Sequence, residues 1–235
     1  MSDLHILSGG AAQGLVKSLA GKFSEHTGLD LSGDFGAVGA MAAKLRAGTP
    51  ADILILTSAL IADLARENLV DRGSIRNVGQ VETALAVREA DPPVLVHDAA
   101  RLREALLASD AIFVPDTRAS TAGLHVAKVL AQLRVADEIE KRLKIYPNGA
   151  TAMRHLSDST ATRPIGCTQA TEIIATEGVK LSGALPKGCE LATLYTTAIA
   201  VKAAHAREAQ VLIDLLTSKD NARLRAQAGF LDQAT

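Results

Sequence analysis

Short apolar runs alternate with helical patterns along most of the chain. Leu4–Leu7 predicts a strand, and Gln13–His26 carries apolar residues at helical spacing. Leu29–Leu31 predicts a second short strand, and Ala40–Arg46 predicts a helix. Asp52–Leu56 is apolar on both faces, which is typical of a central strand in a parallel sheet. This order of elements predicts an α/β fold with a doubly wound parallel sheet and right-handed crossovers.

The same alternation restarts in the second half of the chain. The expected elements there are strands at Glu82–Val87, Ala111–Val114, Arg163–Gly166 and Thr197–Val201, and helices at Ala99–Ala108, Thr121–Leu133, Ala150–Leu156, Gln169–Thr176, His205–Thr217 and Asn221–Ala228. Two such blocks predict two lobes, formed by residues 1–82 with 196–235 and by residues 83–195. Because ligands in these folds bind at strand and helix ends, we expect the ligand cleft between the lobes.

The composition is that of an ordinary globular protein with an aliphatic core. Of the 235 residues, 48% are hydrophobic, 22% are charged and 3% are aromatic, and tryptophan is absent. Twenty-five basic residues stand against 26 acidic ones, and no lysine-rich run or interleaved aromatic platform occurs, so nucleic-acid binding is not expected. No stretch approaches the roughly 18 apolar residues of a membrane span, so membrane insertion is not expected either.

The first residues bear on where the protein works. Met1–Asp3 leads directly into the first strand, without the basic, apolar and small-residue segments of a signal peptide. As written, the chain is expected in the cytoplasm. A periplasmic protein whose signal peptide had been removed would begin in the same way, and a transporter partner is expected only in that case.

Cysteine and histidine usage gives no sign of metal or redox chemistry. Cys167 and Cys189 are the only cysteines, without a CxxC spacing, so we expect two free thiols and no disulfide. The six histidines are scattered without metal-ligand spacing, which predicts no metal site.

Two glycine-containing loops follow the first two predicted strands. Glycine lets backbone N–H groups approach a ligand, and the helix N-terminus beyond each loop carries a partial positive charge. The GxGxxG fingerprint of dinucleotide sites is missing, so no cofactor is expected. The alternative for each loop is a tight strand–helix turn. The candidate ligand-binding residues here are Ser8, Gly9, Gly10, Ala11, Ala37 and Val38.

The segment Pro115–Gly123 combines a guanidinium, three hydroxyls and a helix N-terminus. Arginine suits a carboxylate because its N–H donors form a bidentate fork. Alternatively, Arg118 pairs with Asp116 or Glu172 at the surface, and the hydroxyls are ordinary helix caps. The candidate ligand-binding residues of this segment are Arg118, Ser120, Thr121 and Ala122.

A further candidate segment is Gly166–Glu172, where a predicted strand gives way to a helix. Thr168 and Gln169 stand at this junction, so we expect their side chains at the ligand site. Glu172 is interpreted as a capping carboxylate at the helix start rather than as a ligand group. Ala150, at the start of another predicted helix, is the candidate for one more backbone donor.

Together these segments resemble the bacterial molybdate-binding protein family of extracellular solute-binding proteins, which has the type II periplasmic-binding fold. The landmarks run along nearly the whole chain, and they are Thr49–Ile55, the Ala122–Gly123 helix start, Pro164–Gly166, the Ala209–Ser218 helix and Gly229–Phe230. None is diagnostic alone, but their order and spacing are specific for the fold. The resemblance implies two lobes, each a mostly parallel sheet flanked by helices.

The ligand residues of that family match this sequence only in part. The resemblance places the family's two loop serines at Ala11 and Val38 and its tyrosine at Gln169, while a backbone amide contact at Ala122 needs no particular side chain. The missing hydroxyls each remove about 0.5–1.5 kcal/mol of hydrogen bonding to molybdate. Smaller loop residues and the charge of Arg118 favour an organic anion, so a di- or tricarboxylate is the expected ligand.

An aconitate isomerase-like branch resembles the same family and moves a proton along an allylic tricarboxylate. The alternative function is therefore a cytoplasmic isomerase or tautomerase of an unsaturated polycarboxylate. Such a reaction needs a base within hydrogen-bond reach of an acidic carbon. His125, one turn into the helix after Arg118, is the catalytic candidate, although a histidine at this spacing also suits packing against a strand or exposure to solvent.

Overall fold

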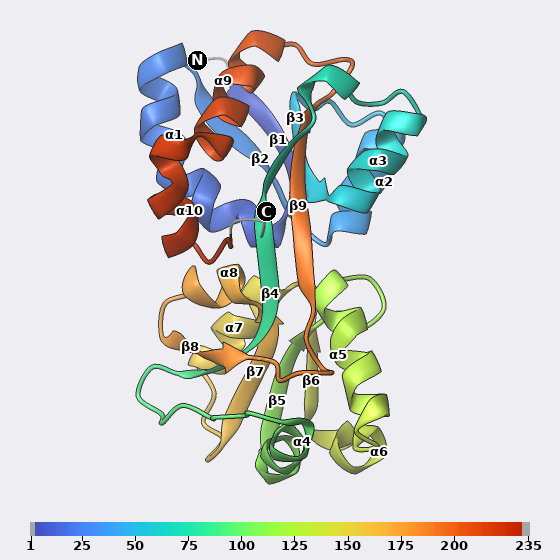
Figure 1. The fold of residues 1–235 in the computed structure, drawn as a ribbon, viewed down its shortest axis with the longest axis vertical. Helices are drawn as coiled ribbons and strands as arrows, with labels where there is room; N and C mark the ends of the chain where they lie inside the picture. The colour runs from blue at the N-terminus through green and yellow to red at the C-terminus, as the bar shows by residue number, and fades with distance from the viewer. Residues whose placement is uncertain (1–2, 232–235) are drawn as a thin grey trace. The chain divides into compact units, whose positions relative to one another are not determined.

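A computed structural model describes residues 3–231, and these form two compact α/β units (Figure 1). Unit 1 contains the described residues up to Val81 together with those from Thr193 onward, and unit 2 contains Glu82–Ala192. The boundaries fall inside two strands, β4 (Arg76–Arg88) and β9 (Ala192–Ile199). The chain therefore passes from one unit to the other in strands and not in flexible linkers.

The sheet of unit 1 has the strand order β2-β1-β3-β9. Its elements are β1 (Asp3–Gly9), α1 (Gln13–Thr27), β2 (Asp30–Gly36), α2 (Val38–Arg46), β3 (Ile53–Thr57), α3 (Ser58–Arg66), β9, α9 (Ala206–Thr217) and α10 (Ala222–Gln227). β1 runs parallel to β2 and β3, whereas β9 is antiparallel to β3. In Figure 1, α1, α9 and α10 cover one face of this sheet, and α2 and α3 cover the other. Both faces of β3 are therefore covered, and Ile53, Leu54, Ile55 and Leu56 are fully buried.

The sheet of unit 2 has the strand order β4-β7-β5-β6, and β8 also pairs with β4. The elements of this unit are the second part of β4, α4 (Ala99–Ala108), β5 (Ala111–Pro115), α5 (Thr121–Gln132), α6 (Ala136–Ile139), β6 (Leu143–Tyr146), α7 (Gly149–Ser157), β7 (Pro164–Gln169), α8 (Ala170–Ile174) and β8 (Val179–Ala184). β5 is parallel to β6 and β7, while β4 is antiparallel to β7 and β8. An aliphatic core that includes Leu85, Val126 and Ile165 joins the sheet to α4 and α5.

The predicted α/β fold is confirmed, with each sheet mixed because antiparallel strands join the parallel ones. Two strands, β6 and β8, were not predicted. Both are partly exposed strands with only one neighbour in the sheet of unit 2, so they need little of the apolar patterning that identifies a central strand. The last strand, predicted at Thr197–Val201, begins earlier, at Ala192, and ends at Ile199.

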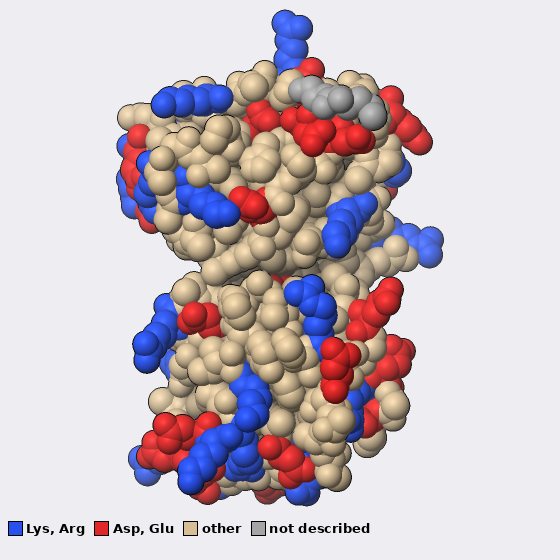
Figure 2. All heavy atoms as spheres, turned by 180° about the vertical axis from the view of Figure 1, so that it is seen from behind, with Lys and Arg blue, Asp and Glu red and all other residues tan. Residues whose placement is uncertain are grey.

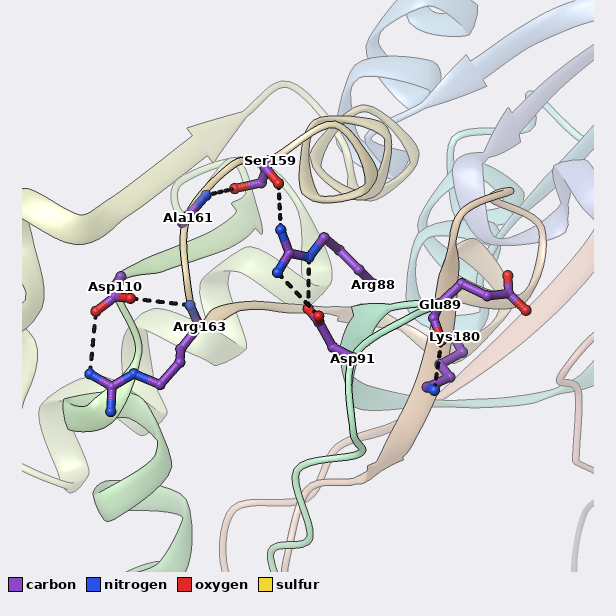
Figure 3. Close-up of polar contacts among 8 residues, drawn as sticks. All are labelled: Arg88, Glu89, Asp91, Asp110, Ser159, Ala161, Arg163 and Lys180. Atoms are coloured by element: carbon purple, nitrogen blue, oxygen red, sulfur yellow. Dashed lines mark hydrogen bonds and ion pairs between the residues drawn. The ribbon is translucent and has the colours of Figure 1, made fainter.

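A group of ion pairs and hydrogen bonds holds the end of β4 to the loop that precedes β7 (Figure 3). The Arg88 guanidinium donates to both carboxylate oxygens of Asp91, at 2.7 and 3.1 Å, and to the Ser159 carbonyl at 2.6 Å. Nearby, the Arg163 backbone N–H donates to Asp110 at 3.1 Å. These contacts fix the start of β7, whereas its other end carries the candidate site.

Two further properties concern the charged side chains at the surface and the length of the helices. Lys and Arg side chains are interspersed with Asp and Glu side chains on the face of each unit that Figure 2 shows. Neither face drawn there carries a broad field of one sign. Among residues 3–231, every helix is too short or too polar to cross a bilayer.

Candidate functional site

The structure brings the two glycine-containing loops of unit 1 together. Gly9 ends β1 and pairs in register with Gly36 at the end of β2, so the turns that follow lie side by side. A Cβ added at Gly9 would lie 2.8 Å from Val38 Cγ1 and 3.0 Å from Tyr195 Cε1. Only glycine therefore allows this close approach. The two loops lie next to each other because β1 and β2 pair in parallel and end at the same edge of the sheet.

These unit 1 loops offer backbone and apolar surface rather than free hydroxyls. The Ser8 hydroxyl is buried and donates to the Gly9 carbonyl at 2.9 Å, so its proton already has an acceptor. Gly10 and Ala11 form a short 3-10 turn before α1, and Ala37 precedes α2 in extended conformation. Ala11 and Val38 are both buried. Neither side chain offers a hydroxyl or a charge to a ligand.

In unit 2, three helices begin at the same edge of the sheet. β6 and β7 both run parallel to β5, and α5, α7 and α8 follow β5, β6 and β7 in the chain. The carboxyl ends of parallel strands meet at one edge, so the helix N-termini that follow them meet there as well. Each N-terminus carries backbone N–H groups without partners inside its own helix.

The start of α5 is capped but leaves donors available. Ser120 is the N-cap, and its hydroxyl accepts a hydrogen bond from the Gly123 N–H at 2.9 Å, as in the alternative interpretation. A Cβ at Gly123 would lie 2.1 Å from the Asp116 carbonyl oxygen, so glycine is needed where the preceding loop crosses the helix. Within residues 3–231, the N–H groups of Thr121 and Ala122 have no hydrogen-bond acceptor.

Arg118 stands in the loop before α5 with its side chain exposed. Its backbone N–H donates to the Asp116 carboxylate at 2.7 Å, so the predicted alternative pairing with Asp116 involves the backbone. The guanidinium has no hydrogen-bond or ion-pair partner among the described residues. The alternative pairing with Glu172 is not formed, because that carboxyl is buried against Thr168. A guanidinium in this state can bind a carboxylate without breaking an internal ion pair.

Glu172 caps the start of its own helix α8, as expected from the sequence, and it also faces the start of α7. Its carboxyl accepts hydrogen bonds from the backbone of Gln169, the N-cap of α8, and from the backbone of Gly149 and Ala150 in α7, and these bonds lower its pKa. Burial has the larger effect and raises the pKa of Glu172 above its ordinary value. The Thr168 hydroxyl donates to the same carboxyl at 2.6 Å. The Ala150 amide predicted as a ligand donor is therefore engaged by an internal carboxyl.

Gln169 is the least satisfied polar side chain of this edge. It is the last residue of β7 and the N-cap of α8, without a side-chain hydrogen bond to that helix. The side chain is buried, and neither Oε1 nor Nε2 has a hydrogen-bond partner among the described residues. A buried amide without partners is costly. In contrast, the neighbouring Thr168 hydroxyl is used by Glu172.

His125 and the cysteines have structural contacts. His125 is half-buried, and its Nε2 lies 2.8 Å from the Cys189 carbonyl oxygen, so Nε2 carries a proton and donates. Among the described residues, Nδ1 of His125 has no hydrogen-bond partner. Both thiols are free and buried, and burial raises the pKa of Cys167 to about 12. Over residues 3–231, the acidic, histidine and cysteine side chains do not gather into a group able to hold a metal ion.

Known proteins share this architecture over nearly their whole length. The aconitate isomerase of a Pseudomonas species is 24% identical over 241 residues, covering 98% of this chain and 88% of the enzyme. The periplasmic molybdate-binding protein of Azotobacter vinelandii superposes with a TM-score of 0.81 at 17% identity, covering 99% of this chain and 100% of that chain. The sulfate-binding protein SubI of Mycobacterium tuberculosis superposes with a TM-score of 0.74 at 17% identity, covering 98% and 86%.

The sequence also matches the family model of the bacterial extracellular solute-binding proteins. The match extends over residues 4–231, which is almost the entire chain. It agrees with the resemblance found from the sequence and with the folds of the two anion-binding proteins. This chain belongs to the bacterial extracellular solute-binding protein family.

Proposed function

We propose that this protein binds a small organic anion, a di- or tricarboxylate, through the loops at the strand ends. The observation that carries the proposal is the buried amide of Gln169, which within residues 3–231 has no partner for either its donor or its acceptor. It stands at the sheet edge where α5 begins, and the N–H groups of Thr121 and Ala122 there have no acceptor. A bound carboxylate would satisfy those N–H groups and gain from the helix dipole.

The charges of the candidate residues favour a ligand of moderate negative charge. Arg118 contributes one exposed cation, and its guanidinium can bind a carboxylate in bidentate geometry. Glu172 places a carboxyl at the start of α7, where it already occupies the donors of that helix. The α7 N-terminus therefore adds little attraction for a second anion, and α5 is the helix that we propose as the main anion contact.

The chemistry of Gln169 favours an organic ligand over an inorganic oxyanion. An ionised tetrahedral oxyanion and an ionised carboxylate both offer only acceptors, so neither group by itself would pair with the amide Oε1. An organic ligand can supply a donor as well. The molybdate-binding and sulfate-binding neighbours support anions as the general class.

A thermal-shift panel tests the proposal with succinate, malate, citrate and trans-aconitate against molybdate, tungstate and sulfate. A ligand at 100 times its dissociation constant stabilises the folded protein by about 2.7 kcal/mol. We expect stabilisation by at least one carboxylate and a loss of this effect in Arg118→Gln. Stabilisation by molybdate or tungstate, with none by any carboxylate, would contradict the proposal. Export and a transporter partner stay predictions that depend on the native start of the chain.

An isomerase acting on an unsaturated polycarboxylate is the second candidate function. It is favoured by the identity of 24% to an aconitate isomerase across 98% of this chain. Proton transfer would use His125 through Nδ1, because Nε2 donates to the Cys189 carbonyl. Proton NMR of trans-aconitate in deuterated water tests this candidate. Exchange of the vinyl or methylene protons supports it, and their persistence at high protein concentration contradicts it.

A further inference from the structure

A second buried hydroxyl without a partner lies beside Gln169 on the neighbouring strand. Thr83 of β4 stands directly opposite Gln169 in the antiparallel register of β4 and β7. Its side chain is 1% exposed, and among the described residues its Oγ1 has no hydrogen-bond partner. Its backbone groups are engaged, since the N–H donates to the Leu191 carbonyl at 2.9 Å and the carbonyl accepts from Leu185 at 3.4 Å. Only the hydroxyl is unpaired.

The two side chains share one face of the sheet. Side chains alternate along a strand, so Thr83 lies on the same face as Leu85, and Gln169 lies on the same face as Cys167. Leu85 and Cys167 pack together in the core that includes residues of α5. Residues directly opposite in an antiparallel pair have Cβ atoms about 4.5–5.5 Å apart. The two side chains are therefore direct neighbours on this face of the sheet.

This pair forms an electrically neutral environment. Thr168 alternates with Gln169 along β7, so the Glu172 carboxyl that Thr168 contacts is on the other face of the sheet. Arg118 is exposed in the loop before α5. The amide and the hydroxyl together offer donors and an acceptor but no charge. If a further carboxylate of the ligand lay beside this pair, it would leave the Gln169 Oε1 unpaired. A hydroxyl group of the ligand can instead donate to Oε1 and accept from Thr83 or from Nε2.

We propose that Thr83 and Gln169 together form a subsite for a hydroxyl group of the ligand, which makes hydroxy-carboxylates the preferred ligand class. The inference rests on the proposed function, because it assumes that a carboxylate binds beside α5. In the described part of the chain, the side-chain hydroxyls of three other buried threonines also lack a hydrogen-bond partner, namely Thr171, Thr193 and Thr197. What distinguishes Thr83 is its register partner, an amide that is itself buried and unpaired.

Isothermal titration of two matched ligand pairs tests the subsite. Malate differs from succinate, and citrate from tricarballylate, by one hydroxyl group. We expect the protein to bind the hydroxylated member of at least one pair about tenfold more tightly. Thr83→Val keeps the shape but removes the hydroxyl, so it should reduce this preference by about three- to tenfold, the value of one hydrogen bond. Affinity for the member without the hydroxyl should change by less than about twofold.

Two further variants control the experiment. Thr83→Ser restores a hydroxyl and should restore the preference. Thr217→Val makes the same exchange in α9, where the Thr217 hydroxyl donates to the Ile213 carbonyl, and should leave the preference unchanged. If the carboxylates bind but the ligand hydroxyl or Thr83→Val has no effect on affinity, the subsite is refuted and the proposed function stands. If no carboxylate binds, the proposed function fails and the subsite with it.

Discussion

The Thr168 hydroxyl donates to the Glu172 carboxyl across 2.6 Å at the point where Gly149 begins α7. This contact joins the end of β7, the short helix α8 and the start of α7 in one buried arrangement. A Cβ at Gly149 would lie 1.9 Å from Glu172 Oε2 and 2.1 Å from Thr168 Oγ1. The carboxyl therefore takes the place that a side chain would occupy. This close packing of Glu172 and Thr168 against α7 requires glycine at position 149.

Replacing Gly149 with alanine should destabilise the protein. The new methyl group collides with two buried polar atoms, and overpacking of this kind costs about 1–3 kcal/mol. Chemical denaturation measures the loss as a lower midpoint. Gly21→Ala in α1 is the matched control, because nothing lies within 4 Å of its Cβ and alanine favours a helix by up to about 1 kcal/mol. Equal stability of the two variants would contradict the arrangement at Gly149.

Glu172 should make stability depend on pH in a defined direction. Because burial raises its pKa, the folded state holds the proton more tightly than the unfolded state, in which the pKa is near the ordinary 4.5. As pH rises from 4.5 through the raised value, the unfolded state releases its proton first and the free energy of unfolding decreases. Glu172→Gln lacks this titration.

The comparison of the two proteins isolates the carboxyl. Unfolding free energies of the unsubstituted protein and of Glu172→Gln, measured from about pH 4 to pH 8, should converge or cross in favour of the variant as pH rises. A difference that stays constant, or that moves toward the unsubstituted protein, would show that the pKa of Glu172 is not raised by folding.

Gln169 should lower the stability of the ligand-free protein but strengthen the binding of carboxylates. Gln169→Met replaces an unpaired buried amide with an apolar chain of similar length, which should raise the free energy of unfolding by about 1–2 kcal/mol. The same variant should weaken carboxylate binding by at least about tenfold. Gln132→Met is the control, since the Gln132 amide is exposed and donates to the Gly188 carbonyl at 3.0 Å. A destabilised Gln169→Met protein that binds carboxylates normally would refute both expectations.

The variant His125→Gln distinguishes a structural from a catalytic role of His125. His125→Gln can keep the donation to the Cys189 carbonyl, so it should cost less than about 1 kcal/mol of stability. If the protein isomerises trans-aconitate with His125 as base, the same variant should slow proton exchange by about 100-fold or more. Exchange at the rate of the unsubstituted protein would remove His125 from the mechanism.

The sequence predicts those parts of the fold whose patterning is local. The central strands β3 and β5 and the helix α4 were recognised because their residues are apolar in a regular pattern. The sequence does not predict β6 and β8, because an edge strand can carry charged and exposed residues. The approach of Gly9 to Val38 follows from parallel pairing, which the strand–helix order already implies.

Contacts between distant segments explain what the sequence could not show. Glu172 caps its own helix as predicted, but its second contact, with the start of α7, exists only because the fold places α7 and α8 at one edge. Thr83 reads as an ordinary strand residue until the register sets it opposite Gln169. The available signal was the position of its polar side chain directly before the apolar run Ala84–Val87.

The most direct test of the ligand site is an NMR titration that follows the Gln169 side-chain NH2 and the backbone amides of Thr121 and Ala122. On addition of malate or citrate, these three signals should shift together and saturate with one dissociation constant. Signals that stay in place while resonances elsewhere saturate would place the ligand at another site and contradict the proposed role of Gln169 and α5.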